Sequence, residues 1–147
     1  MSKNITSGGI YRLTFRAKNI NGWSLFSPIS NIKAATKPQR PPAPTFYYAT
    51  STSVTINMYR SSEDGGDLIV DYELWRNTGG SSTTYVNVTS YDGVSMSWTV
   101  SVSSDGLVSG TIYKFMTVAT NSFGTSDFSD ELNVGVSSFP AKPSPLT

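Results

Sequence analysis

The sequence contains neither cysteine nor histidine. Without cysteine there is no disulfide, no thiolate metal site and no cysteine nucleophile. Without histidine there is no Ser-His-Asp triad, no imidazole base near neutral pH and no zinc site with a histidine ligand. We therefore expect a non-catalytic protein that binds no cofactor and no metal ion.

Charged residues are also few, at 14% of the chain, and the formal net charge is only +1. So small an excess disfavours nucleic acid as a partner, because neutralisation of phosphates drives that binding. No apolar run approaches the roughly 20 residues that span a bilayer. The N-terminus, Met1 to Asn4, lacks the apolar core of a signal peptide. The sequence predicts no membrane-spanning segment, and any anchor or export signal would lie elsewhere.

The residues that are abundant favour short strands joined by polar turns. Serine, threonine, asparagine and glycine are frequent and aromatic residues reach 12%, a mix typical of all-β proteins. Val54, Ile56 and Met58 alternate with polar residues, which predicts a strand with one apolar face. Further strands are expected at residues 68–76, 84–89, 97–102, 111–120 and 131–136, with turn residues between them.

The sequence repeats itself without a gap when Tyr11 is aligned with Tyr113, an offset of 102 residues. The match continues through both proline-rich stretches, where Pro38 meets Pro140 and Pro41 meets Pro143. Further identical pairs include Gly8 and Gly110, Ile10 and Ile112, Ala17 and Ala119, Asn19 and Asn121, Gly22 and Gly124, Ser24 and Ser126, Phe26 and Phe128, Ser27 and Ser129, and Asn31 and Asn133.

This register predicts four segments. Residues 1–36 correspond to the C-terminal part of a module, residues 37–43 to a proline-rich linker, residues 44–138 to a complete module, and residues 139–147 to a linker and the start of a further module. The linker is expected to be extended and to hold the modules apart, because each proline fixes its own backbone angle. A peptide ligand for a proline-reading domain is the alternative interpretation.

The run from Leu107 to Phe115 resembles the fibronectin type III family, in which a leucine, a glycine and a tyrosine build the tyrosine corner. Here these are Leu107, Gly110 and Tyr113. The resemblance implies an immunoglobulin-like β-sandwich of the fibronectin type III type, with one complete module and the F-G hairpin of a preceding one. Two residues depart from the family pattern: Met58 stands where strand B usually has tryptophan, and Thr117 where strand F commonly has valine. These changes predict altered core packing.

Two groups of residues are candidates for protein contacts. Alternation along strand F places Met116 and Val118 outward, beside Trp75, as an apolar patch. The patch is either a contact surface or an ordinary sheet face shielded by long side chains. Trp23 lies in the F-G turn of the first segment, where it serves either recognition or packing between modules. Trp98 is expected to belong to the core.

The acidic cluster of Glu63, Asp64 and Asp67 is interpreted as a solvated turn in preference to a calcium site, because its spacing matches no calcium loop. Two Asn-x-Thr sequons, at Asn4 and Asn87, are candidate acceptors of N-linked glycans in a secretory pathway. They point weakly to the cell exterior.

These observations lead to a hypothesis of function. The chain is expected to be a structural or adhesive part of a tandem array that forms extracellular or cell-surface rods or filaments. Its partners would be other protein modules, including neighbouring copies of itself. The alternatives are an accessory module of a larger secreted enzyme or receptor, and a cytoplasmic cytoskeletal or ciliary array. If the first segment stayed incomplete, its strand edges would favour strand exchange with a second copy.

Overall fold

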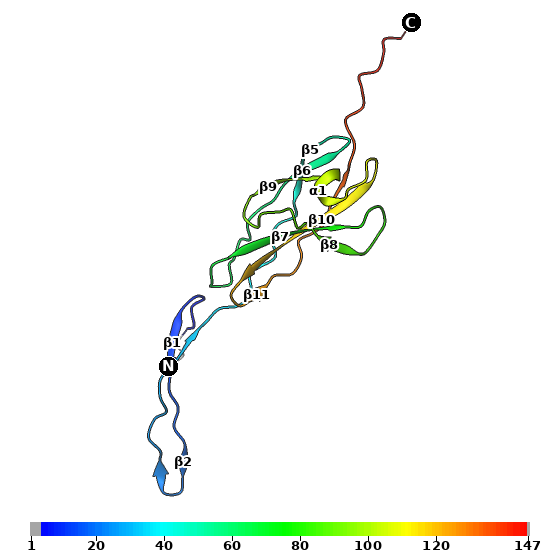
Figure 1. Cartoon of the computed structure of the whole chain (residues 1–147). Coiled ribbons are helices and arrows are strands. Elements are labelled where there is room, and N and C mark those ends of the chain that lie inside the picture. Colours follow the sequence, from blue (N-terminus) through cyan, green and yellow to red (C-terminus); the bar gives the residue numbers. More distant parts are fainter. Residues whose placement is uncertain (1–3, 147) are drawn as a thin grey trace.

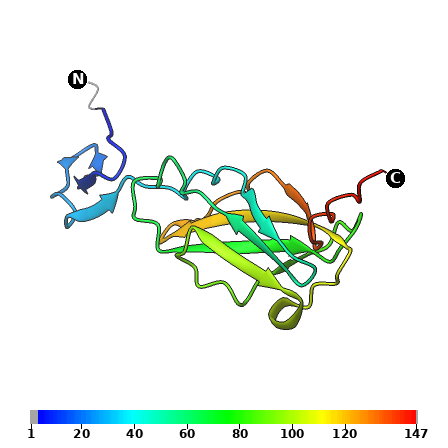
Figure 2. The same cartoon turned by 90° about the horizontal axis from the view of Figure 1, so that it is seen from above.

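The computed structural model describes residues 4–146, so the outermost bounds of the first and last predicted segments, residues 1–3 and 147, lie outside the described residues. An antiparallel hairpin lies at one end of a β-sandwich, and the C-terminal tail leaves from the other end (Figure 1). Figure 2 shows the long strands of the sandwich running along the same axis. The molecule is therefore elongated.

The strands of the hairpin have counterparts, in the register of the repeat, that pair in the same way later in the chain. Strand β1 (Ile10–Leu13) pairs with β4 (Ser30–Lys33), and β2 (Lys18–Asn19) pairs with β3 (Gly22–Trp23) at the tip. In the sandwich, β10 (Ile112–Asn121) pairs in the same way with β12 (Leu132–Gly135) and β11 (Gly124–Thr125). The sequence repeat is thus also a structural repeat.

Two sheets form the sandwich. The first has the order β5 (Thr45–Ala49), β6 (Ser53–Asn57) and β9 (Ser97–Ser101). In the second, β10 lies between β7 (Asp71–Asn77) and the β11 and β12 strands, and β8 (Tyr85–Asn87) pairs with β7. All six expected strands are present, mostly shortened at their ends. A short helix that the sequence analysis missed, α1 (Val102–Asp105), follows β9 and is capped by the Ser101 side chain.

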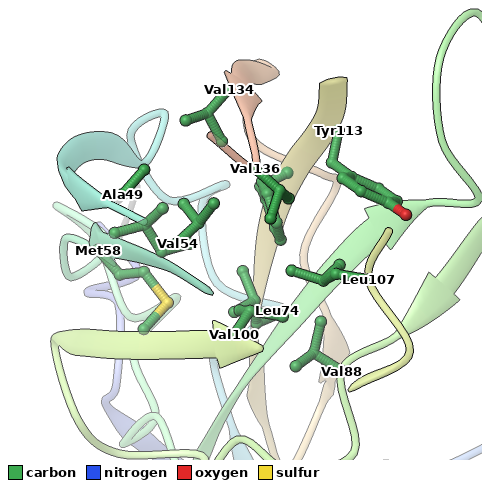
Figure 3. Packing of buried hydrophobic residues seen from close by; sticks show 12 residues of the cluster. Ala49, Val54, Met58, Leu74, Val88, Val100, Leu107, Tyr113, Val134 and Val136 are labelled. Carbon is green, nitrogen blue, oxygen red and sulfur yellow. The ribbon is translucent and has the colours of Figure 1, made fainter. Parts of the chain in front are cut away.

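The core lies between the sheets and follows the predicted alternation (Figure 3). Val54 and Ile56 are fully buried and Met58 is only 4% exposed, so the apolar face of β6 is confirmed. Trp98 packs against this core, edge-on to Tyr91 with ring centroids 5.5 Å apart. Met58 and Trp98 therefore both contribute to the same apolar interior.

The predicted tyrosine corner is present and occurs twice. The hydroxyl of Tyr113 accepts a hydrogen bond from the backbone N–H of Val108 at 2.9 Å, and Leu107 is buried beside it. Gly110 supplies the turn with a φ of 78°. In the hairpin, Tyr11 accepts from the N–H of Thr6 at 2.6 Å. The corner therefore forms locally, with or without a second sheet above it.

Thr117 gives a test of the core. Its side chain is buried in β10, and its hydroxyl has no hydrogen-bond partner among the described residues. Thr117→Val should raise the free energy of unfolding by about 1 kcal/mol, because it removes an unsatisfied buried hydroxyl at constant shape. Urea denaturation checks this. Thr55→Val is the matched control, since the Thr55 hydroxyl bonds that of Thr99 at 2.8 Å, and should give no gain.

Candidate functional site at the hairpin joint

The acidic turn between β6 and β7 packs against the base of the hairpin. The carbonyl oxygen of Gly65 accepts a hydrogen bond from the N–H of Thr36 at 2.9 Å, and that of Glu63 accepts from the N–H of Gln39 at 3.0 Å. The cluster that the sequence suggested as a solvated turn is therefore part of an interface. Among residues 4–146, no group of three or more acidic, histidine or cysteine side chains could hold a metal ion.

Two glycines allow the turn to approach this closely. Gly65 and Gly66 have φ values of 77° and 84°, in the left-handed region. A Cβ atom on Gly65 would lie 2.3 Å from the carbonyl oxygen of Thr36, and one on Gly66 would lie 2.4 Å from the backbone nitrogen of Gly8. Both neighbours are backbone atoms, which cannot swing aside. Any side chain at Gly65 or Gly66 would therefore force the hairpin and the sandwich apart.

Asp67 adds an ion pair to this backbone contact. Its carboxylate pairs with the ammonium of Lys33 on β4 and also accepts hydrogen bonds from the hydroxyl and the N–H of Ser122, the latter at 3.2 Å. These interactions, with the Lys33 hydrogen bond the largest, lower the pKa of Asp67 from 3.8 to about 2. The charged form of Asp67 is thus favoured when hairpin and sandwich are in contact.

Asn121, the counterpart of Asn19 in the repeat, bonds to more than its own turn. Its side chain is only 3% exposed, and its amide nitrogen donates to the carbonyl oxygens of Thr36, at 2.7 Å, and Asp64, at 2.8 Å. Its amide oxygen accepts the N–H of Phe123 at 2.8 Å. In the hairpin, Asn19 makes the equivalent turn bond, with the N–H of Asn21 at 2.9 Å, and no other side-chain hydrogen bond within residues 4–146. Asn121 therefore links three segments of the joint.

The proline-rich segment 37–43 has no regular secondary structure, and it is not a free spacer. Pro38 and Pro41 are buried against the sandwich. Lys37 pairs with Asp127 at 2.7 Å and Arg40 with Asp130 at 2.8 Å. This packing could not be predicted from the sequence, because the two ion-pair partners of the segment lie 90 residues further along the chain. Residues 37–43 thus continue the joint along the edge of the sandwich.

The expected exposed patch on the outer sheet face is only partly present. Trp75 does lie opposite Met116 in the neighbouring strand, as the alternation predicted. However, Met116 is only 9% exposed and Val118 only 2%, so the prediction of an accessible surface at these two residues is wrong. The ring of Phe128 packs edge-on against Trp75, with centroids 5.7 Å apart.

The other predicted site residues lie on the surface. Trp23 is 55% exposed in β3, and the guanidinium of Arg16 is stacked between Trp23, at 4.4 Å, and Phe26, at 4.8 Å. Both sequon asparagines, Asn4 and Asn87, are exposed. The amide nitrogen of Asn87 donates to Glu73 at 3.2 Å. None of these residues takes part in the joint. Among the described residues, no helix is long and apolar enough to span a bilayer.

Comparison with known proteins supports the architecture. No family model matches the sequence, and no curated protein sequence matches it. Among solved structures, a crystal structure of titin domains matches with a TM-score of 0.64 and 22% identity, over 88% of this chain and 41% of that one. The fibronectin type III domain of human fibronectin type III domain containing protein 3 has a TM-score of 0.57 and 25% identity, over 71% and 91%. A titin module from human cardiac muscle has a TM-score of 0.55 and 21% identity, over 65% and 88%.

Replacing Gly66 tests the close backbone contact. Gly66→Ala should release the hairpin from the sandwich, because its Cβ atom would collide with Gly8. Gly80→Ala is the matched control: Gly80 also has a positive φ, of 59°, but an added Cβ atom would meet nothing within 4 Å. In the parent chain and in Gly80→Ala, the residual dipolar couplings of the hairpin and of the sandwich should fit one common alignment tensor. In Gly66→Ala they should not. Equal behaviour of both variants would contradict the role of Gly66.

Asp67 gives the joint a defined dependence on pH. Because contact lowers its pKa to about 2, its contribution is complete above the ordinary value of 3.8 and is lost as the pH falls toward 2. The amide resonance of Ser122, followed by NMR against pH, should therefore titrate with a midpoint well below 3.8. Asp67→Asn should abolish this titration. A midpoint near the ordinary value would show that the ion pair with Lys33 does not form in solution.

Proposed function

Starting from the fibronectin type III fold of the sandwich, we propose that this chain is a non-catalytic structural segment of a tandem array, in which the joint fixes the orientation of consecutive modules. The main support is that the sequence repeat is also a structural repeat. The two copies have the same strand pairing, the same tyrosine corner and the same hydrogen bonds to serine hydroxyls. In each copy, two serine hydroxyls accept backbone N–H groups at corresponding positions, within β10 in the sandwich and between β1 and β2 in the hairpin. These pairs are Ala119 with Ser126, Thr117 with Ser129, Ala17 with Ser24, and Phe15 with Ser27, at 3.0 to 3.1 Å.

The hairpin carries the face of a core without the second sheet that would cover it. Leu13 and Phe15 are 52% and 76% exposed, whereas their equivalents in the sandwich, Phe115 and Thr117, are 0% and 1% exposed. These apolar side chains of the hairpin therefore lie on the face that a second sheet covers in the complete module. Exposed apolar surface of this kind marks an interaction site.

The apolar character of these two side chains fits a sandwich core of their own. In the complete module the phenyl ring belongs to Phe115 and is followed by Thr117, whereas in the hairpin Leu13 is followed by the phenyl ring of Phe15. Cores with the same apolar pattern can be repacked with different side chains without a change of fold. We infer that residues 4–36 form strands F and G of a preceding module, and that residues 44–138 form the next.

The proposal includes a location outside the cell or on its surface, and it includes contacts with other protein modules. Exposure of both sequon asparagines, Asn4 and Asn87, is compatible with N-linked glycans there. An intracellular scaffold array is the alternative, which the likeness to a titin module from cardiac muscle fits equally well. Analysis of glycans on the native protein distinguishes the two.

The missing strands can be supplied from the chain itself. Met1 is aligned with Ser103, so residues 44–102 joined directly before Met1 continue the repeat in register. In this extended chain, we expect the amides of β1 and β4 to exchange with solvent at least about tenfold more slowly, because a covering sheet buries them. Hydrogen exchange followed by NMR measures this.

Two variants of the extended chain serve as controls. Phe15→Asp places a charge in the reconstructed core and should remove the protection. Arg12→Asp changes a residue of β1 whose counterpart, Lys114, does not belong to the core of the complete module, and it should leave the protection intact. If β1 and β4 exchanged as fast in the extended chain as in the parent, the hairpin would not be half of a module and the proposal would fail.

A further inference from the structure

The acidic turn rests on a backbone surface at the base of the hairpin. A corresponding backbone surface lies at the end of the sandwich that is far from the hairpin. Ser109 and Gly110 correspond to Ser7 and Gly8 at the base of the hairpin. The N–H of Gly8 donates to the carbonyl oxygen of Ala34 at 2.8 Å, and that of Gly110 donates to Val136 at the same distance. The φ values of the two glycines, 77° and 78°, agree. The two surfaces therefore have the same local conformation.

Only one of these two surfaces is covered. A Cβ atom on Gly8 would lie 3.1 Å from the carbonyl oxygen of Gly66, whereas one on Gly110 would meet no described atom within 4 Å. Gly110 is exposed, as is Ser138, the counterpart of the hydrogen-bonding Thr36. This end of the sandwich is the one from which the C-terminal tail leaves (Figure 1). The open surface thus faces the direction in which the chain continues.

We propose that the surface of Ser109, Gly110 and Ser138 binds the glycine-glycine turn of a following module of the same type. This inference rests on the proposed tandem array. The N–H of Ser138 would donate to the first glycine of the incoming turn, as Thr36 does to Gly65. The second glycine would rest on Gly110, where a side chain would collide as it would between Gly66 and Gly8. The partner is therefore defined by two small residues in its turn.

The charges at the two surfaces differ, and this difference sets the specificity. Lys33, which pairs with Asp67 in the observed joint, corresponds to Gly135, so the far surface offers no cation at that point. Lys37 is likewise replaced by Phe139. Arg40, which pairs with Asp130 further along the sandwich, does have a basic counterpart, Lys142. The incoming turn therefore needs its glycines but not an acidic residue at the position of Asp67.

A fusion of the chain to itself tests the inference. Thr147 is aligned with Thr45, so residues 46–147 appended after Thr147 continue the repeat in register. With only the first copy labelled, the amide resonances of Ser109, Gly110 and Ser138 should shift relative to the unfused chain. Gly66→Ala in the appended copy should reverse these shifts, and Gly80→Ala in that copy should not. Asp67→Asn in the appended copy should also leave them in place, because its partner position is Gly135.

Unchanged resonances of Ser109, Gly110 and Ser138 in the unsubstituted fusion would overturn the inference, and so would equal effects of Gly66→Ala and Gly80→Ala. The N-terminal joint of the same molecule reports separately on the array. If the Gly8 and Lys33 resonances still show that joint while the far surface stays unchanged, the docking inference fails and the proposed function stands. If neither joint has a fixed orientation, the proposed function fails as well.

Discussion

The backbone contact between Gly66 and Gly8 is the constraint on which the joint depends. Because neither residue has a side chain, the acidic turn approaches the hairpin closely enough for the Thr36 and Gly65 backbones to bond. Only at this separation do Lys33 and Asp67 meet, and only then does Asn121 reach both sides. Surface ion pairs contribute little by themselves, so the main-chain contact sets the geometry and the charges reinforce it.

Much of the fold follows from the sequence, because its signals are local or periodic. The alternation in β6 predicts the buried face of Val54 and Ile56, since side chains of a strand point to opposite sides in turn. The corner at Tyr113 is predictable because its hydrogen bond spans only five residues. The offset of the repeat then carries the same corner to Tyr11. These features can be predicted without knowing which distant segments of the chain pack together.

The candidate site was harder to predict, because it depends on contacts between segments far apart in the chain. Alternation correctly places Met116 beside Trp75, but it cannot show that Met116 and Val118 are buried or that Phe128 packs on Trp75 from another segment. Likewise, the composition of the acidic turn indicates a turn and nothing about the hairpin beneath it. The two adjacent glycines were the available signal, since glycine often marks a close approach of two backbones.

The packing of residues 37–43 has a mechanical consequence. The hairpin and the tail leave the sandwich at opposite ends, so tension on the chain would act along its long axis (Figure 1). Before such a pull reached β5, it would have to detach two buried prolines, the Gln39 bonds to Glu63 and Ser61, and the ion pairs of Lys37 and Arg40. These contacts lie side by side along one edge and would share the load. The segment that joins the modules would thus shield the first strand of the sandwich from force.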